Sequence, residues 1–131
     1  MKKSGLLHHQ VSETIARMGH GDLLVIADAG LPTPPGVPLI DLAVCCGVPP
    51  LLDVARAVAV ELQVESLTVA DELLARDERL SEALRQLFPG ARLAHVSHDE
   101  LKRISERARA VIRTGECTPY SNVVLASGVI F

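Results

Sequence analysis

The chain has 131 residues, a length that predicts one domain and leaves no room for a separate regulatory module. Apolar residues make up 48% of it and its mean hydropathy is +0.27, so it can bury a sizeable core and is not a disordered protein. The net charge is −3 and only 2% of the residues are aromatic, so the chain lacks both the positive charge and the stacking rings of a nucleic-acid-binding protein.

The N-terminus and the cysteines favour a soluble, cytoplasmic protein. The segment Met1–His9 contains basic residues but only two leucines before polar residues resume, so it lacks the apolar stretch of a secretory signal. No apolar run approaches the length of a membrane span. The three cysteines, of which Cys45 and Cys46 are adjacent, do not suggest a disulfide framework and show no zinc-type spacing. We therefore expect a reducing compartment.

Helices and strands alternate along the predicted structure. The first helix has Ser12 as a candidate N-cap and Gly19 just past its end. Apolar periodicity and turn signals predict helices around 11–18, from Pro49-Pro50 to 62, at 76–88 and at 98–107, and strands at 23–27, 39–44, 66–70, 92–96, 110–113 and 122–126. This alternation predicts one α/β domain over residues 1–131, with a mostly parallel or mixed central sheet and helices on both faces.

Polar residues gather on the loops where a ligand would bind. Ligands of open α/β sheets lie beyond the carboxyl ends of strands. Four segments supply candidate side chains there: Gly19–Asp22, Asp28–Pro32, His98 and Gly115–Asn122. They offer two imidazoles, a carboxylate, a phenol and a carboxamide, which suit proton transfer near neutral pH and the binding of hydroxyl groups. No phosphate-binding glycine motif and no activated nucleophile is evident.

Each of these residues also has a structural explanation. His20, between two glycines, caps the preceding helix or transfers protons, and Asp28 forms a turn before Gly30 or binds a ligand. His98 is the first residue of a helix capped by Ser97, where the helix dipole favours a neutral ring. Tyr120 and its neighbours shape a turn or contact a ligand.

Two further hypotheses concern reactive groups. Cys117 is a nucleophile or, the interpretation that we favour, a small buried filler. His20, His98 and Asp28 together would form a metal site of two histidines and one carboxylate, but no motif fixes them on one face.

Beyond these patterns, longer segments resemble the D-ribose pyranase family. The resemblance is carried by Met18–Asp22, Asp28–Pro32, Gly47–Pro49 and above all Val111–Asn122. The first three and last four residues also fit, so it covers essentially the whole chain. The weakest stretch is Glu72 to Arg92, where family members vary in length.

The resemblance implies an isomerase that interconverts the β-pyranose and β-furanose forms of D-ribose without a metal, nucleotide or other cofactor. It implies a homo-oligomer, commonly a decamer of two stacked pentameric rings, with each sugar site shared between neighbouring subunits. Position by position, His20 matches the catalytic proton donor of the family, and Asp28, His98, Tyr120, Ser121 and Asn122 match its sugar-binding positions.

A mechanism follows from these assignments. Ring interconversion breaks the bond between the anomeric carbon and the ring oxygen, passes through the open aldehyde and closes on a different hydroxyl. His20 would protonate the departing ring oxygen while a second group takes the proton of the anomeric hydroxyl. Asp28 would hold His20 in its tautomer or bind a sugar hydroxyl directly.

Three alternatives remain at this stage. Fucose mutarotases share the Gly-His-Gly-Asp and Tyr-x-Asn patterns, but they usually have a bulkier residue and an aromatic residue where this chain has Gly30-Leu31, so we favour ribose. A non-catalytic monosaccharide-binding module would use the same residues without turnover. A metal-dependent hydrolase would lose its activity on chelation.

Overall fold

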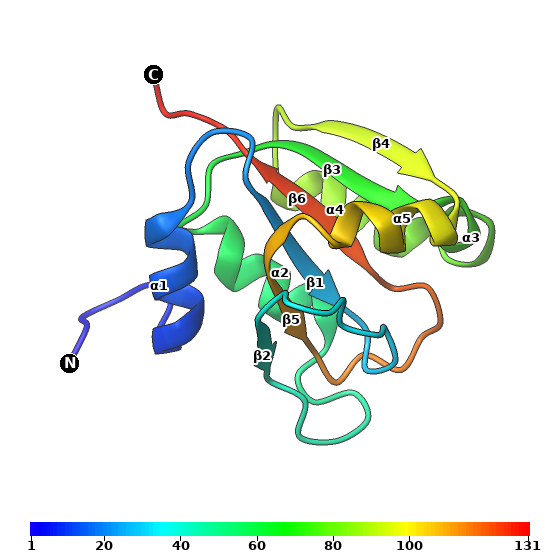
Figure 1. The fold of residues 1–131 in the computed structure, drawn as a ribbon, viewed down its shortest axis with the longest axis horizontal. Helices are drawn as coiled ribbons and strands as arrows, with labels where there is room; N and C mark the ends of the chain where they lie inside the picture. Colours follow the sequence, from blue (N-terminus) through cyan, green and yellow to red (C-terminus); the bar gives the residue numbers. More distant parts are fainter.

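The computed structural model describes residues 1–131 and is organised around one six-stranded sheet (Figure 1). The strands lie in the order β2-β5-β1-β6-β3-β4. Their bounds are β1 Leu23–Ala27, β2 Leu39–Asp41, β3 Val64–Ala70, β4 Arg92–Val96, β5 Ala108–Arg113 and β6 Val123–Ser127. Strand β6 pairs antiparallel with β1 and β3, and every other pair is parallel. The predicted mixed sheet is confirmed.

Five helices cover the two faces of this sheet unequally. They are α1 His9–Arg17, α2 Leu51–Ala59, α3 Asp71–Arg76, α4 Glu78–Leu87 and α5 His98–Ser105. Helix α5 crosses one face, and α2 and α4 lie behind the sheet in Figure 1. None of the five has the length and apolar character of a membrane span. The prediction of helices on both faces is confirmed.

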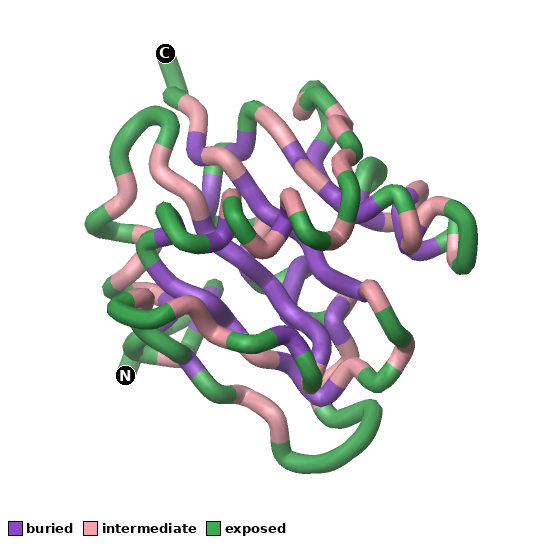
Figure 2. The backbone as a smooth tube through the Cα atoms, turned by 45° about the vertical axis from the view of Figure 1, so that its right-hand side comes forward, coloured by how far each residue is buried: buried purple, intermediate pink, exposed green.

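The core forms because successive side chains of a strand point to opposite faces. In β1, Leu24 and Ile26 join a cluster of 21 buried residues with the helices behind the sheet, whereas Val25 and Ala27 join a cluster of 8 under α5. Figure 2 shows the buried segments running through the central strands and the exposed ones in peripheral loops. The central strands are thus buried on both sides, which holds their ends rigid.

Three local expectations differ from the structure. Helix α1 begins at His9, two residues earlier than expected, because the Nδ1 atom of His8 accepts a hydrogen bond from the Val11 amide at 3.4 Å. Ser12, the expected N-cap, instead donates its hydroxyl to the Leu6 carbonyl at 3.0 Å. The helix expected at 76–88 is α4, which begins at Glu78 because Asp77 accepts a hydrogen bond from the Leu80 amide, and the short helix α3 before it was not expected. Strand β2 has only three residues.

Different loops gather at the two edges of the sheet where its strands begin and end. At its C-terminal edge the five parallel strands end and the antiparallel β6 begins, so Asp28, Thr114 and Asn122 meet there although they are far apart in the sequence. At the opposite, N-terminal edge β1 begins and β6 ends, and the Gly21 amide donates a hydrogen bond to the Ser127 carbonyl at 2.8 Å. Each end therefore collects a different set of loops.

Candidate functional site

A cleft of about 550 Å³ opens at the C-terminal edge. Three segments form its walls: the loop after β1, the start of α5 and the loop between β5 and β6. The lining residues are Asp28, Ala29, Gly30, Leu31, Pro32, His98, Lys102, Glu116, Cys117, Thr118, Pro119 and Tyr120. The cleft thus brings together Asp28, His98 and Tyr120, three of the residues that the sequence predicts for the site.

Asp28 is clamped by Asn122. The Oδ1 atom of Asn122 accepts a hydrogen bond from the Asp28 amide at 2.8 Å, and its Nδ2 atom donates to Asp28 Oδ2 at 3.0 Å. Asn122 is fully buried and Asp28 is 9% exposed. Because one amide satisfies both the backbone and the carboxylate of Asp28, the carboxylate has a fixed orientation at the base of the cleft.

The turn expected at Asp28 is also present. The Gly30 amide donates a hydrogen bond to Asp28 Oδ1 at 3.0 Å, which is the geometry of an Asx turn. Asp28 can therefore both form the turn and bind a ligand, because the turn orients its carboxylate at the wall of the cleft. Each carboxylate oxygen accepts one protein hydrogen bond and retains a further lone pair for a ligand.

The ends of β1 and β5 are joined by Thr114. Its buried hydroxyl donates to the Ala27 carbonyl at 2.8 Å and accepts from the Glu116 amide at 3.2 Å. The Glu116 carbonyl in turn accepts from the Ala29 amide at 2.8 Å. These contacts fix the loops on two sides of the cleft relative to each other.

Glu116 holds the same loop through its side chain. Burial raises the pKa of its carboxyl, but hydrogen bonds from Thr118, from the Leu51 amide at the start of α2 and from Cys117 outweigh burial and lower the pKa below its usual range. Glu116 is therefore an ionised group whose oxygens already have backbone partners.

His98 and Tyr120 form the opposite wall. Ser97 caps α5 as predicted, through a hydrogen bond from the Glu100 amide at 3.2 Å, and Glu72 accepts from the His98 amide at 2.9 Å. The His98 ring meets Tyr120 edge-on, with ring centroids 5.1 Å apart. Its Nδ1 atom is buried and has no hydrogen-bond partner.

Ser121 and Asn122 lie beneath the cleft rather than on its surface. Both are fully buried, neither lines the cleft, and the Ser121 hydroxyl has no hydrogen-bond partner. Tyr120, by contrast, lines the cleft with a left-handed backbone at φ 66°. The roles predicted for Ser121 and Asn122 as direct sugar ligands stay predictions, and within one chain Asn122 supports Asp28 from below the cleft.

His20 lies at the other end of the molecule. It precedes β1, whereas Asp28 follows it, so a strand of five residues, roughly 17 Å at 3.3 Å per residue, separates the two. The His20 ring is 61% exposed, and its Nε2 atom lies 2.8 Å from Glu65 Oε2 at the start of β3. Within one chain, Glu65 rather than Asp28 orients His20, and His20 pairs with Glu65 instead of capping the preceding helix.

The loop that carries His20 is itself shaped by Asp22. Hydrogen bonds from the Gly19 amide and from Arg109 lower the pKa of the Asp22 carboxyl, at distances of 2.8 and 3.0 Å. Gly21 has φ +80°, a conformation that side-chain-bearing residues rarely adopt. The His20 ring is thereby presented outward from the N-terminal edge.

This placement rules out one combination within a single chain. His20, His98 and Asp28 do not come together, and no group of three or more His, Cys, Asp or Glu side chains is positioned to hold a metal ion. The hypothesis of a metal site built from these three residues of one chain is wrong.

The structure adds residues that the sequence interpretation missed. Lys102 lines the cleft four residues after His98 on α5, a helical spacing that places both on one face and was available in the sequence. Glu65 had no local signal, because its contact with His20 spans 45 residues.

The cysteines also differ from expectation. Cys46 and Cys117 are paired as a disulfide with their Cα atoms 5.7 Å apart, and Cys45 is free and exposed. The sequence predicted no disulfide framework, and the structure has this single pair, which the sequence did not predict. The expectation of Cys117 as a buried filler is wrong, because Cys117 lies exposed on the cleft wall. Sequence spacing did not reveal the pair because 71 residues separate its members.

Comparisons with known proteins agree with this architecture. The model of the RbsD / FucU transport protein family matches residues 1–130. The D-ribose pyranases of Symbiobacterium thermophilum and Chloroflexus aggregans are 54% and 51% identical over 131 residues, which cover 100% of this chain and of each relative.

Two solved structures show how far the similarity extends. The structure of Bacillus subtilis RbsD complexed with D-ribose matches with a TM-score of 0.96 and 44% identity over 100% of both chains. The fucose mutarotase of Streptococcus pneumoniae, in complex with L-fucose, matches with a TM-score of 0.78 at 22% identity over 95% of both chains. The second similarity establishes a shared fold alone.

Proposed function

Because this chain belongs to the RbsD / FucU transport protein family, we propose that it is a D-ribose pyranase, an isomerase that interconverts the β-pyranose and β-furanose forms of D-ribose. The observation that carries this proposal is the match over the whole chain to a ribose-bound relative. The cleft of about 550 Å³ is of the size that small-molecule sites have, and polar groups converge on it.

The cleft supplies hydrogen bonds that suit a neutral sugar. Asp28 accepts a hydrogen bond from a sugar hydroxyl through a lone pair that its protein partners leave free. His98, Lys102 and Tyr120 contact the remaining hydroxyls from the other wall. A sugar that lacks one of these hydroxyls would leave a buried polar group unpaired, which is the basis of selectivity.

The reaction needs two balanced proton transfers. His20 donates a proton to the ring oxygen as its bond to the anomeric carbon breaks, and a second group takes the proton of the anomeric hydroxyl as the aldehyde forms. Ring closure on another hydroxyl reverses both transfers. Asp28 and His98 both line the cleft and are the candidates for this second group. The variants D28N and H98Q distinguish them, because loss of the base lowers kcat whereas loss of a sugar ligand raises KM.

Because His20 and the cleft lie at opposite edges of the sheet, a complete site requires two chains. We infer that the exposed His20 of one subunit enters the cleft of a neighbour in a ring-shaped homo-oligomer, for which a decamer of two pentameric rings is the expected form. This also assigns Asp28 within its own chain to sugar binding rather than to orienting His20.

The activity is tested by proton NMR saturation transfer on D-ribose at equilibrium with a trace of protein, with L-fucose measured in parallel. Faster exchange between the pyranose and furanose signals of ribose supports the proposal. Exchange between fucose anomers alone would assign a mutarotase. Broadened ribose signals without faster exchange would assign a non-catalytic sugar-binding module.

The shared site is tested by mixing two inactive variants. H20A keeps an intact cleft and D28N keeps an intact His20, so hybrid oligomers contain some complete sites and should regain exchange after subunit mixing. A mixture of the double variant H20A/D28N with either single variant should regain no exchange, because no complete site can form. No recovery of exchange in mixed oligomers, or full activity in a monomer verified by light scattering, would refute the shared site.

We place the protein in the cytoplasm, where its furanose product would supply ribose catabolism. Rapid ring exchange benefits a following reaction whose enzyme consumes only the furanose form of ribose. Fractionation of cells that express the tagged chain tests this location, and recovery of the protein outside the cytoplasmic fraction would contradict it.

A further inference from the structure

Two loops meet beside the cleft through their backbones. The Gly47 amide donates to the Gly115 carbonyl at 2.6 Å, and the Gly115 amide donates to the Pro49 carbonyl at 2.8 Å. A Cβ atom on Gly115 would lie 2.4 Å from the Val48 carbonyl oxygen and 2.5 Å from that of Cys45, so only glycine permits this approach. Backbone contacts alone, independent of the disulfide, thus hold the loop 42–50 against the loop 114–122.

This contact brings Cys46 and Cys117 within bonding range. Their Cα atoms are 5.7 Å apart, close to the most common spacing of protein disulfides. Both residues are exposed, so a small oxidant or reductant in solution can reach them. Since the backbone contacts set the spacing, the reduced pair remains in position to form the bond again.

Cys117 is also part of the cleft wall, between Glu116 and Thr118. A bulky group attached to its sulfur would occupy space that the proposed function assigns to the sugar. Cys46 does not line the cleft, so a bond to Cys46 draws the sulfur of Cys117 toward the neighbouring loop.

We propose that Cys46 and Cys117 form a redox-sensitive modification site for small disulfide oxidants of the glutathione class, in which Cys46 acts as the resolving cysteine that keeps adducts off the cleft. A thiolate first attacks the oxidant, forming a mixed disulfide and releasing one thiol. The second cysteine then displaces the other thiol. In total, two cysteine thiols lose two protons and two electrons, and one oxidant molecule becomes two thiols.

The test compares two variants that are first reduced with dithiothreitol, separated from it and then treated with oxidised glutathione. C45S keeps the pair and removes the adjacent exposed thiol, whereas C45S/C46S leaves Cys117 alone. By intact mass and peptide mapping, C45S should become lighter by two hydrogens with a Cys46–Cys117 link, and C45S/C46S should become heavier by one glutathione at Cys117. Dithiothreitol should reverse both changes.

The effect on the cleft rests on the proposed function and is measured separately. After oxidation, C45S should retain its rate of ribose exchange. The rate of C45S/C46S should fall at least tenfold and should recover on treatment with dithiothreitol. A stable glutathione adduct on C45S would overturn the pairing, and a full adduct on C45S/C46S with unchanged exchange would overturn the link to the cleft. If no untreated variant exchanges ribose, the proposed function fails while the mass measurements still decide the pairing.

Discussion

The two edges of the sheet use polar residues in opposite ways. At the C-terminal edge Asp28 and Asn122 are buried, and uncharged amides hold the Asp28 carboxylate in a fixed geometry. At the N-terminal edge the polar contacts are more exposed, such as the hydrogen bond between His20 and Glu65 and the ion pair between Lys2 and Glu61. Buried networks are rigid and costly to break, whereas exposed pairs contribute little and are screened by salt.

This difference agrees with the proposed division of roles, in which one edge binds the sugar and the other supplies the proton donor. The rigid edge is a prepared binding surface whose geometry does not depend on a partner. The exposed edge presents a histidine whose ring is 61% exposed and hydrogen-bonded to a solvent-accessible carboxylate, so it remains available to another subunit. In the proposed mechanism, sugar binding and proton donation lie at opposite ends of one fold, and a homo-oligomer would bring them together.

Replacing His20 should have the largest effect on activity, because it removes the proton donor of the proposed reaction. H20A should lower ribose exchange by about 10²- to 10⁴-fold, the usual contribution of one general acid or base. Its unfolding midpoint and oligomer size should stay unchanged, since the side chain is 61% exposed. H9A, at an exposed histidine of α1, is the matched control and should exchange ribose normally. Near-normal exchange by folded H20A would remove His20 from the mechanism.

Breaking the clamp at the rigid edge should affect both stability and binding. N122A removes both hydrogen bonds to Asp28 and leaves buried polar groups unpaired, which should lower the free energy of unfolding by about 1–3 kcal/mol and weaken ribose binding. Denaturant unfolding and ribose titration measure the two effects.

A conservative variant sharpens this test. N122D keeps an oxygen for the Asp28 amide but removes the donor to Asp28 Oδ2 and places a second carboxyl beside the first. Its ribose binding should therefore depend on pH more steeply than that of the native chain. Native binding and stability in both variants would mean that the clamp does not position Asp28.

A smaller effect is expected at Lys102. K102A removes an ammonium group from the cleft wall and should raise the KM for ribose about 3- to 10-fold with little change in kcat, as the loss of one hydrogen bond predicts. R103A is the matched control, because Arg103 is the next residue of α5 and does not line the cleft. Equal effects of the two substitutions would show that Lys102 has no specific contact with the sugar.

The sequence predicted the rigid edge better than the exposed one, for a physical reason. Strand and cap signals are local, so the ends of β1, β4 and β5 were placed almost correctly, and the parallel arrangement then brought Asp28 and His98 to one edge. The short helix α3 was missed because its six residues carry too little periodicity.

Contacts between distant segments could not be predicted in the same way. The pairing of Cys46 with Cys117 and that of His20 with Glu65 depend on which strands are neighbours, which no local pattern specifies. The separation of His20 from Asp28, by contrast, was available in the sequence, because the strand predicted at 23–27 lies between them and coincides with β1.

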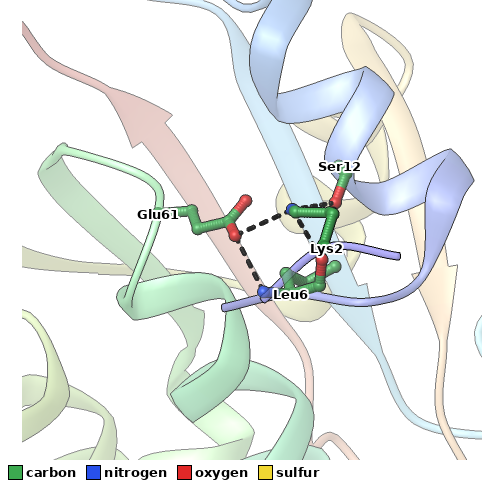
Figure 3. Close-up of polar contacts among 4 residues, drawn as sticks. All are labelled: Lys2, Leu6, Ser12 and Glu61. Carbon is green, nitrogen blue, oxygen red and sulfur yellow. Dashed lines mark hydrogen bonds and ion pairs between the residues drawn. The ribbon is translucent and has the colours of Figure 1, made fainter. Parts of the chain in front are cut away.

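The smallest effect concerns the N-terminal segment at the exposed edge (Figure 3). Glu61 accepts a hydrogen bond from the Leu6 amide at 2.8 Å and from Lys2 Nζ at 3.2 Å, and Lys2 also reaches the Leu6 carbonyl and the Ser12 hydroxyl. The bond from the Leu6 amide, followed by that from Lys2, lowers the pKa of the Glu61 carboxyl. A lowered pKa stabilises the folded chain above the usual pKa of glutamate, and this stabilisation is lost as the pH falls through the lowered value.

The Leu6 amide resonance in a two-dimensional NMR titration measures this contact. It should shift with a midpoint below the usual glutamate pKa, and molar salt should move that midpoint toward the usual value because Lys2 is 47% exposed. E61Q keeps an acceptor without a charge and should abolish the shift. The resonances of the Asn122 side-chain amide should not shift with added salt, because that amide and its partner Asp28 are buried. A salt response at Asn122 that equals the one at Leu6 would contradict the contrast between a rigid edge and an exposed one.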